Sequence, residues 1–252
     1  MAEVLTCPGP AKSFLGFCPQ GIALLRPQKG RRKLLPSEQQ MYEYKIANPM
    51  LELVCSITRE FARFAPNYVT PPERAVFPIF GARPSRSGSR DLHPGAIWVH
   101  RNAKGPRGAC FYFHFTSSEA VVLGGVYAPA PSELPAYRSL LQQRYKEFHD
   151  ILRDRRLKAL TGGLEGEKLQ SMPKGLSQDH PAADLLRRRQ WYVCAMLEMA
   201  LLSTTQLLPT LVRHFETMAP FVEFLNLSLP QPRRRSLVRS FANGDLTEGT
   251  RL

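Results

Sequence analysis

Residues 111–129 read FYFHFTSSEAVVLGGVYAP, and this stretch decides the fold class. Aromatic and β-branched residues favour strands, and residues 116–119 are a polar connection of hairpin length, so the stretch predicts a β-hairpin. Side chains alternate along a strand. One face of the first strand is therefore all phenylalanine, and the other carries Cys110, Tyr112 and His114.

The segments on either side of the hairpin complete the fold prediction. Further strands are expected at residues 75–80, 96–100 and 190–195. Helices are expected at residues 49–64, 132–143, 145–155, 180–188 and 207–225. Strands and helices that follow one another without strict alternation indicate an α+β fold, with a largely antiparallel sheet packed with helices.

Single residues add detail to these elements. Asn48 and Ser132 are expected to cap the helices that follow them. Gly124 and Gly125 in the second hairpin strand indicate a bulge or a close approach of backbone. Trp191 favours a place in the core, and we interpret its neighbour Tyr192 in the same way.

The chain has 252 residues, 43% of them hydrophobic, which is enough for one domain with a proper core. Residues 1–37 are rich in Gly and Pro without a sustained period, so we expect a disordered or weakly ordered segment. The ordered domain is predicted at residues 38–226. Residues 227–252 are predicted to form a basic, disordered tail.

The five cysteines include no C-x-x-C pair, and their spacing suits neither a zinc site nor a disulfide framework. We therefore expect a reducing cytoplasm, and neither a metal nor a cofactor. The most apolar stretch, residues 195–208, is interrupted by Glu198 and several polar residues, so we expect no membrane span and no membrane partner.

The formal net charge of +13 permits binding to nucleic acid. Much of the excess lies in the two expected tails, and an arginine-rich composition also follows from a GC-rich genome. Nucleic acid is therefore a partner that we do not favour.

A second stretch, residues 166–193, reads GEKLQSMPKGLSQDHPAADLLRRRQWYV. Together with the hairpin it makes residues 41–226 resemble the domain of unknown function 2461 family (DUF2461). That family has no established activity, so the resemblance implies relatives but no reaction.

Such proteins have a basic motif, Arg-Asp-x-Arg-Phe-Ser-Lys-x-Lys-x-Pro-Tyr-Lys-x-His, before the second strand. Here the corresponding residues 82–96 read ARPSRSGSRDLHPGA. The resemblance places Arg83, Ser85, Arg86 and His93 on the motif, whereas its Lys-x-Pro-Tyr-Lys core is missing. A degenerate member that has lost its ligand is therefore one reading of this chain.

Arginine forks and Gly/Ser backbone can hold a phosphate or carboxylate, so Arg83, Ser85 and Arg86 are candidate anion-binding residues, with Arg187 as a further candidate. A solvated basic loop is the competing interpretation. No P-loop motif is present.

The catalytic candidates are His93, His114 and Tyr112, because histidine exchanges protons near neutral pH. Ordinary structural roles compete with this interpretation for both histidines. Asp179, His180 and Asp184 fit helix initiation better than acid–base chemistry. Glu165 and Glu167 are expected to orient arginines 187–189.

The best hypothesis from the sequence is a domain that binds a small anionic or phosphorylated ligand through the arginine-rich loop beside the sheet. The alternative is a non-catalytic interaction module that binds nucleic acid or an acidic protein through its basic tails. Whether the chain is an enzyme, and its oligomeric state, stay open.

Overall fold

The computed structural model describes residues 14–26, 35–76, 93–103 and 108–229. Its centre is one antiparallel sheet of four strands in the order β1-β2-β3-β4. The strands are β1 (Gly95–Val99), β2 (Cys110–Phe115), β3 (Ala120–Val126) and β4 (Trp191–Met196). With the helices packed on it, the sheet confirms the predicted single-domain α+β fold.

The predicted hairpin is β2–β3. Its turn closes where the Thr116 N–H donates to the Glu119 carbonyl at 2.8 Å, and the Thr116 hydroxyl accepts from the Ser118 and Glu119 N–H groups. The register runs from Cys110 opposite Gly125 without a bulge. A Cβ on Gly124 would lie 3.0 Å from the Val222 side chain, so this glycine serves a close approach of helix to strand.

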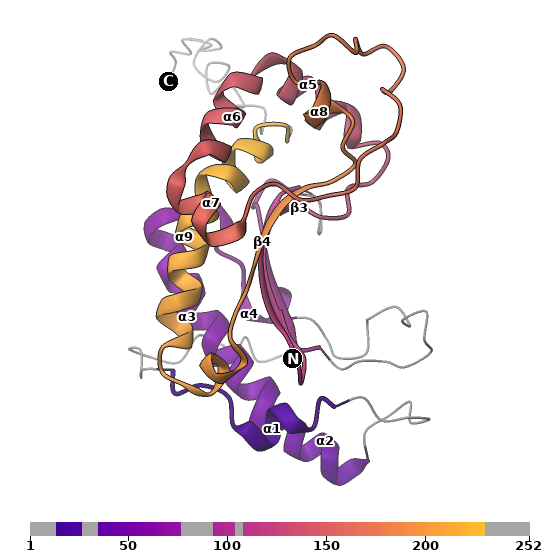
Figure 1. Cartoon of the computed structure of the whole chain (residues 1–252). Helices are drawn as coiled ribbons and strands as arrows, with labels where there is room; N and C mark the ends of the chain where they lie inside the picture. Colours follow the sequence, from indigo (N-terminus) through magenta and orange to yellow (C-terminus); the bar gives the residue numbers. More distant parts are fainter. Residues whose placement is uncertain (1–13, 27–34, 77–92, 104–107, 230–252) are drawn as a thin grey trace, which may run out of the picture.

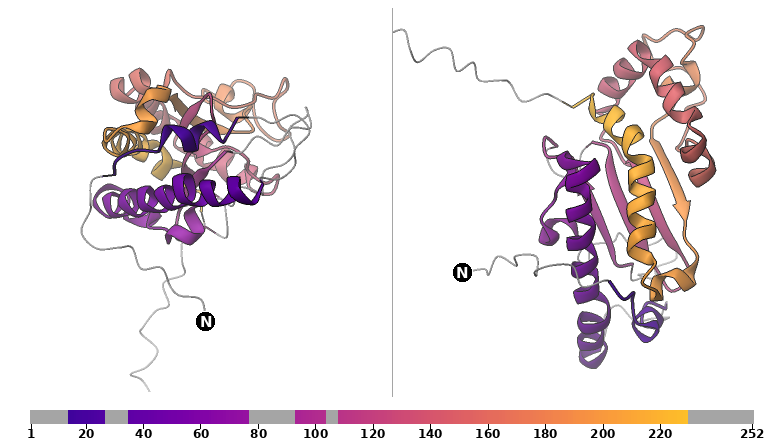
Figure 2. Two further views of the ribbon diagram at one scale, coloured as in Figure 1. Left: turned by 90° about the horizontal axis from the view of Figure 1, so that it is seen from below. Right: turned by 90° about the vertical axis from the view of Figure 1, so that its left-hand side faces the viewer.

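Two long helices, α3 (Asn48–Phe64) and α9 (Leu207–Asn226), cover one face of the sheet (Figure 1; Figure 2, right). Phe61 of α3 lies at the centre of the core that they enclose. Its ring centroid is 5.0 Å from that of Phe111 and 5.5 Å from that of Phe215. Trp98 beside it donates its indole N–H to the Thr58 hydroxyl at 3.0 Å, so this buried polar pair is satisfied.

Four further helices form a group that begins beyond one end of the sheet and runs back along α9 (Figure 1). They are α5 (Leu134–Gln143), α6 (Tyr145–Arg153), α7 (Arg155–Thr161) and α8 (Ala183–Leu186). The helix predicted at residues 145–155 ends at Arg153, because Asp154 breaks it and caps the next one by accepting the Leu157 N–H at 2.8 Å.

Residues 14–26 differ from the expectation of a weakly ordered segment at residues 1–37. They include α1 (Pro19–Ala23), and Phe17 is 1% exposed with its ring centroid 4.5 Å from that of Phe115. The Phe17 N–H also donates to the Leu202 carbonyl at 2.7 Å. The buried side chains of Phe14 and Phe17 hold this segment on the domain. The sequence here has no helical or strand periodicity from which this packing could be predicted.

Neither predicted cap forms. The helix α2 (Pro36–Tyr42) is followed directly by the π-helical turn η1 (Glu43–Ala47) and then by α3, so Asn48 lies within a continuous helix and not at its start. The wider π-helical turn accommodates the missing N–H of Pro49. Helix α5 begins at Leu134 rather than at Ser132. Short helices also occur as η2 (Pro66–Tyr68), α4 (Pro72–Ala75) and η4 (Met199–Ser203).

Of the strand predicted at residues 75–80, Ala75 lies in α4 and Val76 forms a bridge with Ala96; residues 77–80 lie outside the described part. No helix among the described residues is long and apolar enough to cross a membrane.

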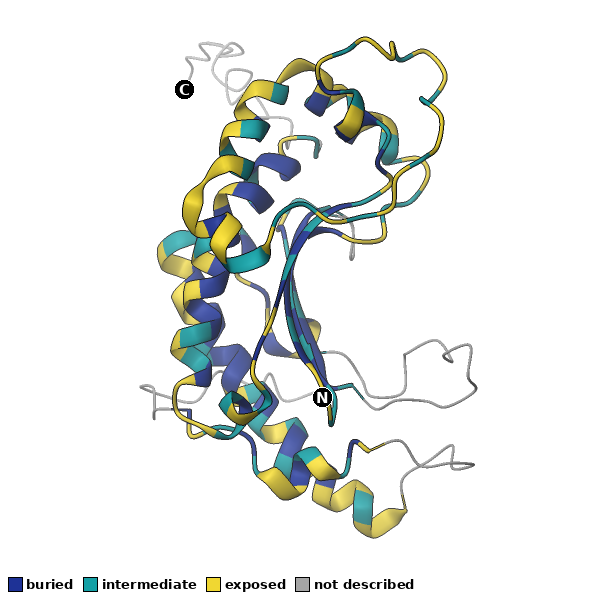
Figure 3. Cartoon of the chain, in the orientation of Figure 1, coloured by how far each residue is buried: buried dark blue, intermediate teal, exposed yellow. Residues whose placement is uncertain are grey.

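The second face of the sheet is the open one. Within the described ranges no helix packs across it, and it forms a concave surface between the α5–α8 end and the opposite end of the strands (Figure 1). Cys110 and Leu123 on this face are buried, most of its other residues are intermediate and Met196 is exposed, whereas the helix-facing side is buried throughout (Figure 3).

Candidate functional site

The open face is a grid of side chains set by the strand register. Because strands lie about 4.8 Å apart, residues paired across the sheet are neighbours. The three rows are Ile97–Tyr112–Leu123–Cys194, Gly95–His114–Val121–Met196 and Val99–Cys110–Gly125–Tyr192.

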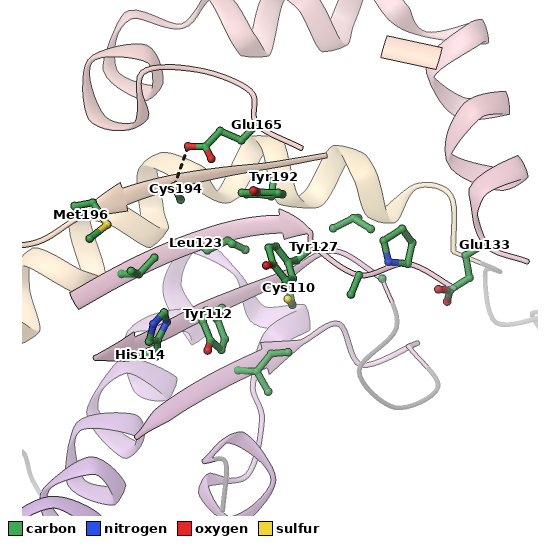
Figure 4. A pocket seen from close by; sticks show the side chains of 16 residues that line it. Cys110, Tyr112, His114, Leu123, Tyr127, Glu133, Glu165, Tyr192, Cys194 and Met196 are labelled. Atoms are coloured by element: carbon green, nitrogen blue, oxygen red, sulfur yellow. Dashed lines mark hydrogen bonds between the residues drawn. The ribbon is translucent and has the colours of Figure 1, made fainter. Parts of the chain in front are cut away.

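Most of the grid lines a cavity of about 580 Å³ (Figure 4). Its further walls come from the connections at the end of the sheet. They are formed by Tyr127, Pro129, Glu133 and Glu165. The site thus combines a floor of strands with walls of loop residues.

The chain beside β4 places Glu165 at the cavity. The Glu165 N–H donates to the Tyr192 carbonyl at 2.8 Å. Gly166 follows with φ of +120°, and a Cβ there would overlap the Gln190 carbonyl, so glycine permits the close passage. The Cys194 thiol donates to Oε1 of Glu165 at 2.9 Å (Figure 4).

Gln190 ties the two loop walls together. Its Nε2 donates to the Tyr127 carbonyl at 2.5 Å, and its Oε1 accepts the Glu167 N–H at 3.1 Å. The rings of Tyr127 and Tyr192 lie with centroids 5.1 Å apart and planes at 62°. The tyrosine pair and Glu165 are therefore held by one set of backbone contacts.

Both thiols in the cavity are poor nucleophiles. Burial, together with the Glu165 carboxylate, raises the pKa of Cys194 to about 12, and burial alone raises the pKa of Cys110 to about 12. Since the thiolate is the reactive form, neither cysteine is activated at neutral pH. Burial also raises the pKa of Tyr112 to about 12, so its phenol keeps its proton.

His114 lies on the same face, toward the other end of the cavity. Its Nε2 is 3.5 Å from Glu119 Oε1, while its buried Nδ1 has no hydrogen-bond partner among the described residues. Burial lowers the pKa of His114, against the opposing effect of Glu119, so the ring is neutral at pH 7. Its ring centroid is 5.3 Å from that of Tyr112 and 5.8 Å from that of His93.

The structure thus brings together the three residues that we proposed for catalysis. Arg187 is not among the residues that line the cavity; it lies between α8 and β4, where its carbonyl accepts the Leu169 N–H at 2.7 Å. Arg83, Ser85 and Arg86 lie outside the described residues.

Glu165 and Glu167 were both expected to pair with arginines 187–189, and one of the two does so. Glu167 is 3.6 Å from Arg189, as predicted, but Glu165 contacts Cys194 and Tyr192 instead. Asp184 pairs with Lys168 at 2.7 Å.

His180 accepts the Ala182 N–H through Nδ1 at 3.0 Å, which supports its structural role before α8.

Sequence reasoning missed four residues of the site, namely Tyr127, Glu165, Tyr192 and Cys194. Tyr192 was expected in the core, but adjacent strand residues point to opposite faces. Trp191 takes the core side and donates its indole N–H to the Leu185 carbonyl, so Tyr192 faces the cavity. Applying the alternation rule to residues 191–196 would have found both Tyr192 and Cys194.

No group of three His, Cys, Asp or Glu side chains in the described ranges could hold a metal ion. Fold and cavity define an α+β domain with a pocket of small-molecule size on the open face of an antiparallel sheet. The sequence profile of the family described as conserved hypothetical protein (DUF2461) matches residues 25–224, and the chain belongs to that family. No curated protein and no solved structure matches the chain.

Proposed function

We propose that the open face of the sheet binds a small organic molecule. The observation that carries this proposal is the cavity of about 580 Å³ on a sheet face that no helix of the described residues covers. Ligand pockets in proteins have volumes of roughly 300–1,000 Å³ and are mostly apolar with a few polar groups. The lining has this character, because Ile97, Leu123 and Val121 line the cavity together with three tyrosines and His114.

The polar groups favour recognition by hydrogen bonds. A protonated phenol both donates and accepts, and neutral His114 offers Nδ1, which is buried without a partner in the described structure. A buried polar atom without a partner is costly, so a ligand that pairs with it gains specificity. The raised pKa of both thiols argues against covalent chemistry through cysteine.

A thermal-shift screen of small molecules tests the proposal, with Val121→Trp as the blocking variant. Val121 lies between His114 and Met196 on the cavity floor, so an indole there occupies the space beside His114, whose Nδ1 the ligand is proposed to pair with. The matched control is Val69→Trp, at a position 51% exposed away from the cavity.

At about 100 times its dissociation constant, a ligand stabilises the protein by about 2.7 kcal/mol. For a domain of this size that is a shift of roughly 5–11 °C. We expect the shift in the wild type and in Val69→Trp, and its loss in Val121→Trp. A shift that survives Val121→Trp would place the ligand elsewhere and refute the proposal.

A second candidate is an anionic or phosphorylated ligand held by Arg83, Ser85 and Arg86. The position of His93 supports this candidate. His93 is the first described residue after these three, and its ring lies against that of His114, which lines the cavity. Phosphate, nucleotides and carboxylates at low salt should then stabilise the wild type but not Arg83→Ala/Arg86→Ala. The exposed pair Arg155→Ala/Arg156→Ala is the control.

If Arg155→Ala/Arg156→Ala loses the stabilisation as fully as Arg83→Ala/Arg86→Ala does, the anions respond to the general positive charge of the protein and not to Arg83 and Arg86. Steeply salt-dependent binding to DNA that disappears on removal of residues 227–252 would favour the interaction module instead.

A further inference from the structure

The charge of the cavity is opposite to that of the whole chain. The chain has a net charge of +13, yet the described lining contains the carboxylates of Glu133 and Glu165 and no lysine or arginine. Low-dielectric walls around a concave site focus the field of the charges that line it. The described part of the cavity therefore favours positive groups over anions.

The nearby arginines do not neutralise Glu165. Arg188 donates to the Gly166 carbonyl at 3.1 Å and faces Asp184, and Arg189 pairs with Glu167. Within the described ranges, no lysine or arginine forms an ion pair with Glu165. A carboxylate at a partly apolar wall without a cation is a binding group for a cationic ligand.

Aromatic rings stand beside this carboxylate. Tyr127 is 56% exposed, and its ring lies at 62° to that of Tyr192, so the two rings form an angled pair at the cavity wall (Figure 4). Burial and, after it, the nearby Glu165 carboxylate raise the pKa of the Tyr192 phenol. The electron-rich face of an aromatic ring attracts a cation within about 6 Å of its centroid.

From these contacts we infer that the ligand carries an organic ammonium group, bound by the rings of Tyr127 and Tyr192 next to Glu165. The inference rests on the proposed binding function and names the chemical class of its ligand. The apolar floor at Ile97 and Leu123 accommodates a carbon skeleton, so an alkylated or aryl amine fits the site better than a metal ion.

Gln190 prepares the site before the ligand arrives. By bonding the Tyr127 carbonyl and the Glu167 N–H, it holds both loop walls against β4. Little ordering is then left for the ligand to impose, and preorganisation of this kind raises affinity.

The test compares choline with its uncharged carbon isostere, 3,3-dimethylbutan-1-ol, in titrations of the full chain followed by NMR. We expect choline to bind about ten-fold more tightly, which corresponds to about 1.4 kcal/mol and lies between the values for an exposed and a desolvated cation–π contact. Equal affinity for the two probes, or no binding of choline, overturns the inference.

Matched variants locate the effect. Tyr127→Leu should weaken choline binding about ten-fold and Tyr127→Phe should retain it, whereas Tyr44→Leu, at a residue 75% exposed on η1, should change nothing. Glu165→Gln should also weaken binding, and Glu167→Gln, outside the cavity, should not. The assignment is contradicted if Tyr44→Leu weakens choline binding as much as Tyr127→Leu does, or if Glu167→Gln weakens it as much as Glu165→Gln does.

Failure of this inference differs from failure of the proposed function. If a neutral or anionic compound stabilises the protein and Val121→Trp abolishes that effect, the cavity binds ligands but not cations. If choline binds and neither Tyr127→Leu nor Glu165→Gln weakens its binding, the tyrosine pair is not its site and the inference is wrong.

Discussion

Asn226 at the end of α9 should be among the most costly polar residues of this chain to remove. It is 4% exposed, and its amide makes a two-way contact with the fully buried Ala109. Oδ1 accepts the Ala109 N–H at 2.8 Å, and Nδ2 donates to the Ala109 carbonyl at 2.8 Å. Nδ2 also donates to the Tyr68 hydroxyl, so one side chain joins the start of β2 to η2.

Asn226→Ala would leave two buried backbone groups of Ala109 without partners. Each costs about 1–3 kcal/mol, so the free energy of unfolding should fall by about 4 kcal/mol. For a domain of this size the corresponding decrease in Tm is roughly 8–16 °C.

Urea denaturation followed by circular dichroism measures the free energy of unfolding, and hydrogen exchange at the Ala109 amide reports the broken contact directly. Ser228→Ala is the control, because its partly buried hydroxyl donates to the carbonyl of Leu225, three residues earlier, and joins no distant backbone group in the described part of the chain. That variant should lose about 1 kcal/mol or less. If Asn226→Ala were no less stable than Ser228→Ala, water would be pairing with Ala109 and the reasoning would fail.

Three further predictions concern backbone, protonation and thiols. Gly125→Ala should destabilise the protein by well over 1 kcal/mol in denaturant titrations, because φ is +127° and the new Cβ would overlap the Trp191 carbonyl, whereas Gly162→Ala, at φ +74° in open space, should lose about 1 kcal/mol. Burial lowers the pKa of His214 below its usual 6.5, so this imidazole gains a proton in the unfolded chain at a higher pH than in the folded protein. The free energy of unfolding should therefore fall as the pH drops below 6.5, and the fall should be smaller in His214→Gln. The Gln20 backbone N–H is the main cause that lowers the pKa of Cys18, whereas the pKa of Cys194 is about 12. Cys18 should therefore be alkylated before Cys194 at about pH 8, as measured by peptide mapping. The reverse order would contradict both pKa shifts.

Local patterns predicted the elements in which local physics dominates. The β2–β3 hairpin follows from the alternation in residues 111–129, and the core stripe of α3 follows from helical spacing, with Met50, Leu53 and Phe61 all fully buried. The face shared by Tyr112 and His114 was also predictable, because alternation on one strand requires no knowledge of the partner strands.

The rest of the site depends on contacts between distant segments. Glu165 belongs to a loop without periodicity, and only its backbone pairing with Tyr192 brings it to the cavity. Tyr127 and Gln190 meet across 63 residues of sequence. The position of Arg187 is set by the α8–β4 connection, outside the residues that line the cavity, and its role in anion binding stays a prediction.

The passage of residues 165–168 beside β4 also bears on how the protein behaves at high concentration. β4 is an outer strand of the sheet, and the exposed hydrogen-bonding groups of such a strand can template pairing with another molecule. Here Glu165 and Lys168 bridge to Tyr192 and Arg188 and occupy part of that border. The segment that brings Glu165 to the cavity thus also leaves less of the β4 edge available for strand addition by another molecule.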